Sequence, residues 1–270
     1  MIARCAAARS ARRRAIAFVA GFVGVVGVPS IIALACTDIS GGSDSILSLQ
    51  FDTLASPSVV VGDTLRDTTG AIILPVVRAF NFKGGEISSA KIYFQSPDSG
   101  VTVDSATGVI VGDSLRSTPA RIIATAGKLQ AIQKINLTLR PDTIVPSHAV
   151  DTIFFSLVDS TKDTSEVMKV QLLHGLNTTD SAVSNYIVSF AIVSQSNPNL
   201  ADLVNESIKL SHVDTTDASG IAGRKILVHP VNLGSATAVD SVIVQATAKY
   251  RGQPVPGSPV RLVIVLQPGS

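Results

Sequence analysis

From residue 46 onward, short apolar runs alternate with polar turn residues. Gly, Asp, Ser and Pro separate the runs at a spacing of about 8 to 12 residues, which is typical of a β-sandwich or barrel. No long apolar stripe of helical period follows residue 36, so the pattern predicts strands. In the first half we expect strands at Ile46–Phe51, Val59–Val61, Ile72–Val77, Ala90–Phe94, Val101–Val103, Val109–Val111, Arg121–Ala124 and Ala131–Leu137.

The second half repeats this style. The two halves are separated by a segment with prolines at 141 and 146, and proline disfavours helix and stiffens a joint. We therefore predict an all-β fold of two tandem β-sandwiches, at residues 46–140 and 150–270, with a linker at 141–149. Seven strands are expected in the second sandwich, as in constant-type immunoglobulin domains. They are Thr152–Leu157, Val167–Leu172, Tyr186–Val193, Ser207–Leu210, Arg224–Val228, Ser241–Ala248 and Val260–Val265.

The composition favours strands, and the charge balance argues against nucleic-acid binding. Val, Ile and Thr are abundant, and they pack well on a pleated surface. The net charge of +2 depends on five arginines before residue 36; the remainder has 17 basic and 20 acidic residues. A mildly acidic body has no electrostatic footprint for nucleic acid, so we expect no nucleic-acid partner.

The N-terminus has the anatomy of a secretory signal. A basic stretch of 14 residues precedes an apolar run, Ala15–Ala35, which Pro29 interrupts near its end. These features predict a helical signal peptide at residues 1–35. An uncleaved transmembrane helix is the alternative, because 21 residues could span a bilayer. The cluster Arg12–Arg14 also permits a twin-arginine export signal.

The sequence Ala33-Leu34-Ala35-Cys36 resembles the lipobox of bacterial lipoproteins, with Ala33 where that family usually has Leu. The resemblance implies cleavage between Ala35 and Cys36, and lipidation of Cys36. Two or more acyl chains give a stable membrane anchor. Residues 36–45 would then be a flexible polar tether, and the membrane would be a partner through the lipid. Thr37 follows the cysteine, which under the enterobacterial sorting habit implies the outer membrane or cell surface of a bacterial envelope.

Both halves resemble bacterial immunoglobulin-like domains. The segments at 58–64, 94–104, 106–110 and 120–127 are similar to the group 2 domains, although Phe94-Gln95 stands where a Trp often occurs. The segments at 188–192, 215–222 and 242–248 are similar to the group 1 domains of invasin and intimin. The resemblance implies that both halves are immunoglobulin-like β-sandwich domains, with Asp217 and Gly220 in a tight turn.

Gly112-Asp113-Ser114-Leu115 spells the nucleophile motif of a family of serine esterases. Those enzymes carry an Asp-x-x-His base, and none of the four histidines here has Asp three residues before it. A serine without a base is not activated at neutral pH. The segment 111–116 also nearly duplicates 61–66, so we interpret both as the same strand–turn–strand device and keep an esterase using Ser114 as the alternative.

Few other residues indicate chemistry. His148, His174, His212 and His229 have no metal-ligand spacing. Asp159, Asp163 and Glu166 could form a calcium loop, although a solvated turn is the simpler interpretation. Asn197–Asn205 is expected to be an exposed loop that could bind a ligand. Sugar sites usually need aromatic platforms, and a chain with no Trp and three Tyr is poorly supplied with them, which argues against such a site. Tyr93, Tyr186 and Tyr250 are the aromatic residues that could still form one.

These features together predict a lipid-anchored envelope protein whose sandwiches act as a structural, adhesive or binding module. We expect no catalytic residue, no cofactor and no bound metal, and an unknown protein or surface ligand as the partner. The alternatives are the esterase and loop-mediated binding of calcium or glycan.

Overall fold

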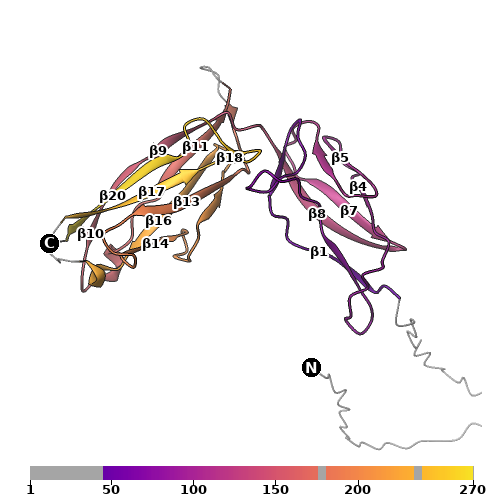
Figure 1. The fold of residues 1–270 in the computed structure, drawn as a ribbon, viewed down its shortest axis with the longest axis horizontal. Coiled ribbons are helices and arrows are strands. Elements are labelled where there is room, and N and C mark those ends of the chain that lie inside the picture. Colours follow the sequence, from indigo (N-terminus) through magenta and orange to yellow (C-terminus); the bar gives the residue numbers. More distant parts are fainter. Residues whose placement is uncertain (1–44, 176–180, 234–238, 270) are drawn as a thin grey trace, which may run out of the picture. The chain divides into compact units, whose positions relative to one another are not determined.

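The computed structural model describes residues 45–175, 181–233 and 239–269. Among these residues the regular structure is β-strand apart from two short 3-10 turns, η1 (Ser160–Lys162) and η2 (Pro230–Asn232). The expected all-β fold is therefore confirmed (Figure 1). The predicted signal peptide and all but the last residue of the predicted tether lie outside the described residues.

The first sandwich is built on a four-stranded sheet. Its strands are β1 (Ser48–Phe51), β2 (Ser58–Val60), β3 (Val77–Phe80), β4 (Tyr93–Gln95), β5 (Val101–Val103), β6 (Ile110–Gly112), β7 (Ala120–Ala126) and β8 (Leu129–Thr138). The sheet has the order β2-β8-β7-β4, and β1-β3 and β5-β6 form two further pairs. The β2–β8 pairing is parallel, whereas β7–β8 and β4–β7 are antiparallel.

Alternation of side chains places the core of this sandwich. In β7 the buried residues are Ala120, Ile122, Ala124 and Ala126, and the residues between them are more exposed. Successive side chains of a strand point to opposite faces of a sheet, so one face of β7 turns inward. The buried residues that cluster there are Val59, Leu65, Phe94, Val101, Ile110, Ala120, Ile122, Ala124, Ile135 and Leu137.

The two near-duplicate segments, 61–66 and 111–116, lie against each other in this sandwich. The Gly62 amide donates to the Gly112 carbonyl at 2.8 Å, and the Gly112 amide donates to the Asp63 carbonyl at 3.0 Å. A Cβ added at Gly112 would lie 2.8 Å from the Val60 carbonyl oxygen. Position 112 therefore admits the close backbone approach because it lacks a side chain.

The second sandwich has two larger sheets. Its strands are β9 (Thr143–His148), β10 (Val150–Phe155), β11 (Met168–His174), β12 (Ser181–Ala182), β13 (Ile187–Ser194), β14 (Ala201–Val204), β15 (Val213–Thr215), β16 (Ile221–Val228), β17 (Asp240–Thr247), β18 (Lys249–Tyr250), β19 (Gln253–Pro254) and β20 (Val260–Pro268). One sheet has the order β10-β20-β17-β13-β15. The other has the order β12-β11-β16-β14, with β9 pairing β11 beside it. Figure 1 shows β20, β17 and β13 side by side, as their antiparallel registers require.

The long strands of this sandwich have period-two burial. β16 alternates half-buried and buried residues throughout, and β20 buries Val260, Leu262, Ile264 and Leu266. The inner faces of the two sheets form a second hydrophobic cluster, separate from that of the first sandwich. This pattern is typical of two sheets packed face to face.

Three local expectations are corrected by the structure. Ile72–Val77 is not a strand: Ile72 forms an isolated bridge with Arg66, and β3 begins at Val77. Ser207–Leu210 is part of a turn in which Asn205 Oδ1 accepts hydrogen bonds from the Ser207 and Lys209 amides. Residues 141–149, expected as a linker, contain β9, which pairs with β11 and joins the second sandwich.

Candidate functional site

The best-formed site lies where loops of the first sandwich meet the β13, β17 and β18 region of the second. Its first component is the turn after β2. The Asp63 amide donates to the Val60 carbonyl at 3.0 Å, which closes the turn, and Gly62 has a positive φ of 79°. The Asp63 carboxylate accepts a hydrogen bond from the Thr64 amide at 2.8 Å. Asp63 is only 5% exposed, so its charge must be paired within the protein.

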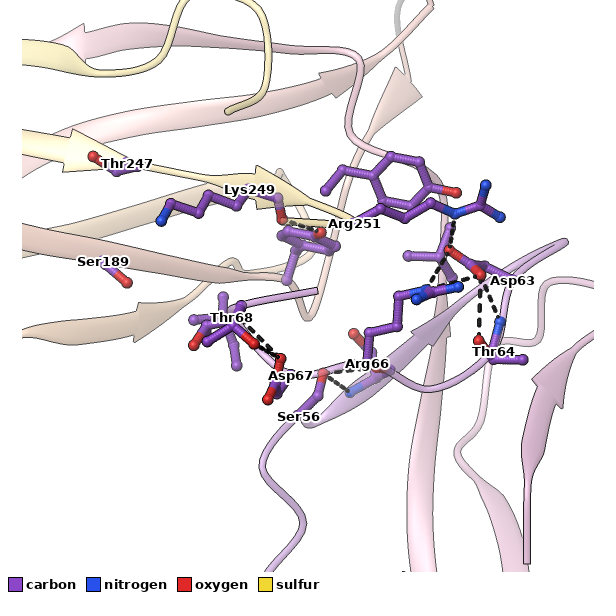
Figure 2. Close-up of a pocket in the computed structure, with 16 residues that line it drawn as sticks. Ser56, Asp63, Thr64, Arg66, Asp67, Thr68, Ser189, Thr247, Lys249 and Arg251 are labelled. Atoms are coloured by element: carbon purple, nitrogen blue, oxygen red, sulfur yellow. Dashed lines mark hydrogen bonds and ion pairs between the residues drawn. The ribbon is translucent and has the colours of Figure 1, made fainter. Parts of the chain in front are cut away.

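Two arginines from different sandwiches supply that pairing. Arg66 Nε lies 3.2 and 3.3 Å from the two carboxylate oxygens of Asp63, and Arg66 Nη1 donates to the Gly70 carbonyl. Arg251, between β18 and β19, donates from Nε to Asp63 Oδ2 at 2.8 Å. Figure 2 shows both guanidinium groups converging on Asp63. We call Asp63, Arg66 and Arg251 the junction triad.

The contacts at the triad shift the pKa values of Asp63, Arg251 and the neighbouring Tyr250. Burial raises the pKa of Asp63, but the hydrogen bonds from Arg251, the Thr64 amide and Arg66 outweigh it and bring the pKa from 3.8 to about 2. The Asp63 carboxylate in turn raises the pKa of Arg251. Burial, with Asp63 nearby, raises the pKa of Tyr250. Asp63 and Arg251 are therefore ionised at neutral pH, and the Tyr250 hydroxyl beside them is neutral.

Three hydroxyl groups add neutral hydrogen bonds at the junction. Ser58 Oγ donates to the Asn185 carbonyl and Thr138 Oγ1 donates to the Ser184 carbonyl, both at 2.6 Å. Each of these bonds joins the first sandwich to the second. Within the second sandwich, the Tyr186 hydroxyl donates to the Lys249 carbonyl at 2.6 Å.

The backbones also approach closely at the junction. A Cβ added at Gly70 would lie 2.3 Å from the Gly252 amide nitrogen. A Cβ added at Gly252 would lie 2.4 Å from the Thr69 carbonyl oxygen. Both glycines have positive φ values, so each position is closed to larger residues by space and by conformation.

A cavity of about 330 Å³ opens beside the triad. Residues 56–69 of the first sandwich form one wall, and β13, the end of β17 and β18 form the other. The lining includes Thr68, Ser189, Thr247, Lys249, Tyr186 and Tyr250. The volume falls at the lower end of the range of about 300 to 1,000 Å³ that is usual for small-molecule sites.

Sequence reasoning found this site in part. The segment 61–66 was interpreted as a strand–turn–strand device, and Asp63 does lie in a turn there. Its pairing with Arg251 has no local signal, because 188 residues separate the two. Of the three tyrosines named as sugar platforms, Tyr186 and Tyr250 line the cavity. Tyr93 lies on β4 of the first sandwich and is 57% exposed.

The structure places the esterase motif in the packed turns of the first sandwich. Gly112 closes against the β2 turn, and the Asp113 carboxylate accepts a hydrogen bond from the Thr102 hydroxyl at 2.7 Å. The Ser114 amide donates to the Gly100 carbonyl, and within the described residues no hydrogen bond joins Ser114 to a histidine. All four histidines belong to the second half of the chain. The motif therefore has a local structural use.

Two of the three acidic side chains named for calcium, those of Asp159 and Asp163, form hydrogen bonds within the fold, whereas Glu166 contributes its backbone amide. Asp159 caps η1, and Asp163 accepts a hydrogen bond from the Ser156 amide at 3.0 Å. The Glu166 amide donates to the Asp151 carboxylate. In residues 45–175, 181–233 and 239–269 there is no group of three or more His, Cys, Asp or Glu that could hold a metal ion.

The segment Asn197–Asn205 begins as a turn and continues as strand β14. Asn197 begins a turn closed by the Leu200 amide, but β14 follows directly, and Leu200, Leu203 and Val204 are buried. The expectation of an exposed loop is therefore wrong from residue 200 to residue 204.

Two of the histidines pair with acids on the surface of the second sandwich. His174 Nδ1 lies 2.7 Å from Asp142 Oδ2 and 2.9 Å from the Arg140 carbonyl oxygen. His229 Nε2 lies 2.9 Å from Asp202 Oδ2. The two pairs involve different segments of the chain, and within the described residues neither belongs to a group of three or more candidate metal ligands.

Cys36, the predicted lipidation site, lies outside the described residues, and so does Ala35 on the other side of the expected cleavage point. Within the part of the chain that the structure describes, no helix has the length and hydropathy needed to cross a membrane.

No protein-family model and no curated protein matches this chain. Solved structures are similar to it at low identity. Domains 4 and 5 of the S-layer protein SbsC match with 11% identity and a TM-score of 0.30, over 83% of this chain and 98% of that one. Cadherin domains 3–6 of protocadherin gamma B2 match with 12% identity and a TM-score of 0.29, over 83% and 51%. The first two cadherin domains of human protocadherin-24 match with 14% identity and a TM-score of 0.26, over 82% and 98%.

Proposed function

We propose that this chain is a lipid-anchored protein of a bacterial cell envelope, and that its two sandwiches form a non-catalytic structural, adhesive or binding module. The first sandwich would be a group 2-like and the second a group 1-like bacterial immunoglobulin domain. The leader and the Ala33-Leu34-Ala35-Cys36 sequence support the anchor. Two or more acyl chains would hold the module at the membrane.

The observation that carries the proposal is the direct bonding between the sandwiches. An ion pair from Arg251 to Asp63 and hydroxyl bonds from Ser58 and Thr138 connect them. Only residues 139–142 separate β8 from β9 along the chain. A module that displays a binding face away from a membrane gains from such a connection, because it retains the geometry of the two sandwiches.

Metabolic labelling with radioactive palmitate tests the anchor, and the two cysteines of the chain provide a matched pair. We expect label in the wild type and in Cys5→Ala, because Cys5 belongs to the leader that is removed. We expect no label in Cys36→Ala, which should also leave the membrane fraction. A soluble, unlabelled wild-type product, or equal label in Cys36→Ala, would contradict the proposal.

A further inference from the structure

We infer that the junction cavity binds an acidic saccharide, a sugar that carries a carboxylate beside its hydroxyl groups. This inference rests on the binding role proposed above and names the ligand class of that role. It is carried by the unpaired polar groups of the cavity, by its charge and by its tyrosines.

Four polar side chains of the cavity have no partner among the described residues. They are the ammonium of Lys249 and the hydroxyls of Thr68, Ser189 and Thr247. Ser189 and Thr247 are directly opposite each other on β13 and β17. In Figure 2 the Lys249 side chain extends toward the side of the cavity where Thr247 and Ser189 lie, and Thr68 lies below it in the view. A ligand in the cavity would therefore meet one cation and several groups that both donate and accept hydrogen bonds.

The charges of the lining favour an anion. Arg66, Arg251 and Lys249 line the cavity with two carboxylates, Asp63 and Asp67, which leaves one net positive charge. Asp63 is satisfied by the two arginines, and Asp67 Oδ1 accepts hydrogen bonds from Thr69 and the Ala71 amide. Lys249 is thus the cation whose charge remains unmatched, and a carboxylate would give it a charge-assisted hydrogen bond.

The tyrosines and the apolar residues of the lining provide surfaces against which a sugar ring can pack. Tyr186 is held by its hydrogen bond to the Lys249 carbonyl, and Val60 and Ile187 add apolar surface to the lining. Tyr250 lies beside Arg251, whose guanidinium is 5.3 Å from the ring centre. Ligand sites usually combine aromatic and apolar walls with a few placed polar groups. The C–H faces of a sugar ring suit such walls, while its hydroxyls and carboxylate suit the unpaired polar groups.

Calorimetric titration of the full chain tests this inference. The protein is kept in a zwitterionic detergent, because sugar-based detergents would compete for the cavity. The probes are trimers of galacturonate, of mannuronate and of N-acetylneuraminate, with maltotriose as the neutral sugar and inorganic phosphate as the plain anion. We expect at least one acidic trimer to bind more tightly than both maltotriose and phosphate.

Variants assign the binding to the cavity. Lys249→Ala should weaken binding by about tenfold or more, since it removes a hydrogen bond to a charged group. Thr247→Val keeps the shape of the side chain and should weaken binding by a smaller factor. Lys169→Ala, which removes an exposed lysine of β11 outside the cavity, is the matched control and should bind as the wild type does.

Tyrosine fluorescence provides a second measurement, because the chain has no Trp and three Tyr. In Tyr93→Phe both remaining tyrosines line the cavity, so binding should change their emission. The inference is overturned if no acidic trimer binds, if Lys249→Ala binds equally well, or if phosphate or maltotriose binds as tightly. Palmitate labelling is measured separately, so a labelled protein that does not bind contradicts the ligand and leaves the anchor intact.

Discussion

The Nε atom of Arg251 lies 2.8 Å from the Asp63 carboxylate, and the two residues belong to different sandwiches. Asp63 is buried and also pairs with Arg66, whereas the Arg251 side chain is half exposed. The charge of the buried Asp63 carboxylate is thus balanced by one arginine from each sandwich, Arg66 and Arg251. Loss of either arginine would leave part of that charge unpaired at the contact between the two sandwiches.

Replacing Asp63 by Ala should lower the free energy of unfolding by about 1 to 3 kcal/mol, because it leaves Arg66 and Arg251 without their acceptor. Urea unfolding followed by circular dichroism measures the change. The control is Asp52→Ala, since Asp52 pairs with Arg78 on an exposed surface. Such a pair contributes less than about 1 kcal/mol. Equal effects of the two substitutions would contradict the role of the triad.

The stability contributed by Asp63 should depend on acid pH. Its pKa is lowered from 3.8 to about 2 in the folded protein, so the contribution is present above pH 3.8 and is lost as the pH falls toward 2. A shift of this size corresponds to about 2 kcal/mol. The difference in unfolding free energy between the wild type and Asp63→Asn should therefore shrink between pH 5 and pH 2. A difference that stays constant over this range would show that the ionised carboxylate is not the stabilising group.

Gly112→Ala should destabilise the first sandwich by about 1 to 3 kcal/mol through overpacking. The added methyl group would lie 2.8 Å from the Val60 carbonyl oxygen, a backbone atom that cannot rotate away. Ser114→Ala, two residues further along the same turn, should leave stability unchanged. Thermal unfolding compares the two, and an ester-hydrolysis assay on Ser114→Ala should give the same background rate as the wild type. A hydrolysis rate that falls in Ser114→Ala would restore the esterase alternative.

Arg224 of β16 should be replaceable by an apolar residue of similar length. It is buried, its Nη1 pairs with Asp214 at 3.0 Å, and its Nε has no hydrogen-bond partner among the described residues. The guanidinium also lies 6.0 Å from the centre of the Phe190 ring. Arg224→Met should leave the free energy of unfolding nearly unchanged or raise it, whereas Asp214→Ala should lower it by about 3 kcal/mol by leaving a buried charge unpaired. Chemical unfolding of both variants measures this, and the reverse order would contradict it.

The sequence was most informative where one face of a strand is buried. The expected strands Tyr186–Val193, Ser241–Ala248 and Val260–Val265 correspond to β13, β17 and β20 within a few residues. β17 and β20 alternate along nearly their whole length, and β13 does so from Ile187 to Ala191, because one face of each strand turns toward the core. The expected strand Ile72–Val77 is wrong because Pro75, which has no amide hydrogen to donate, interrupts the run. The run is also apolar throughout, without the alternation of apolar and polar residues that marks a half-buried strand. Ile72 and Val76 are each 52% exposed.

Turn chemistry explains the other difference in the second sandwich. Ser207–Leu210 has the composition of a strand, but Asn205 organises the segment as a turn with its side-chain oxygen, and Ile208 adopts a φ of +56°. A β-branched residue rarely has positive φ, so no propensity rule would place it there. The junction triad could not be predicted from the sequence for a different reason. Asp63 and Arg251 are 188 residues apart, and their pairing depends on how the two sandwiches meet.

The parallel pairings have a mechanical consequence. β2 is parallel to β8 in the first sandwich, and β10 is parallel to β20 in the second. In each case an early strand of the sandwich adjoins its last strand, so tension between the two ends of the chain acts along the paired strands. The hydrogen bonds of each pair would then be loaded in shear and would have to break together, whereas a hairpin pulled from its open end opens one bond at a time. A chain held at a membrane by one end and at a surface by the other would resist pulling through these two pairs.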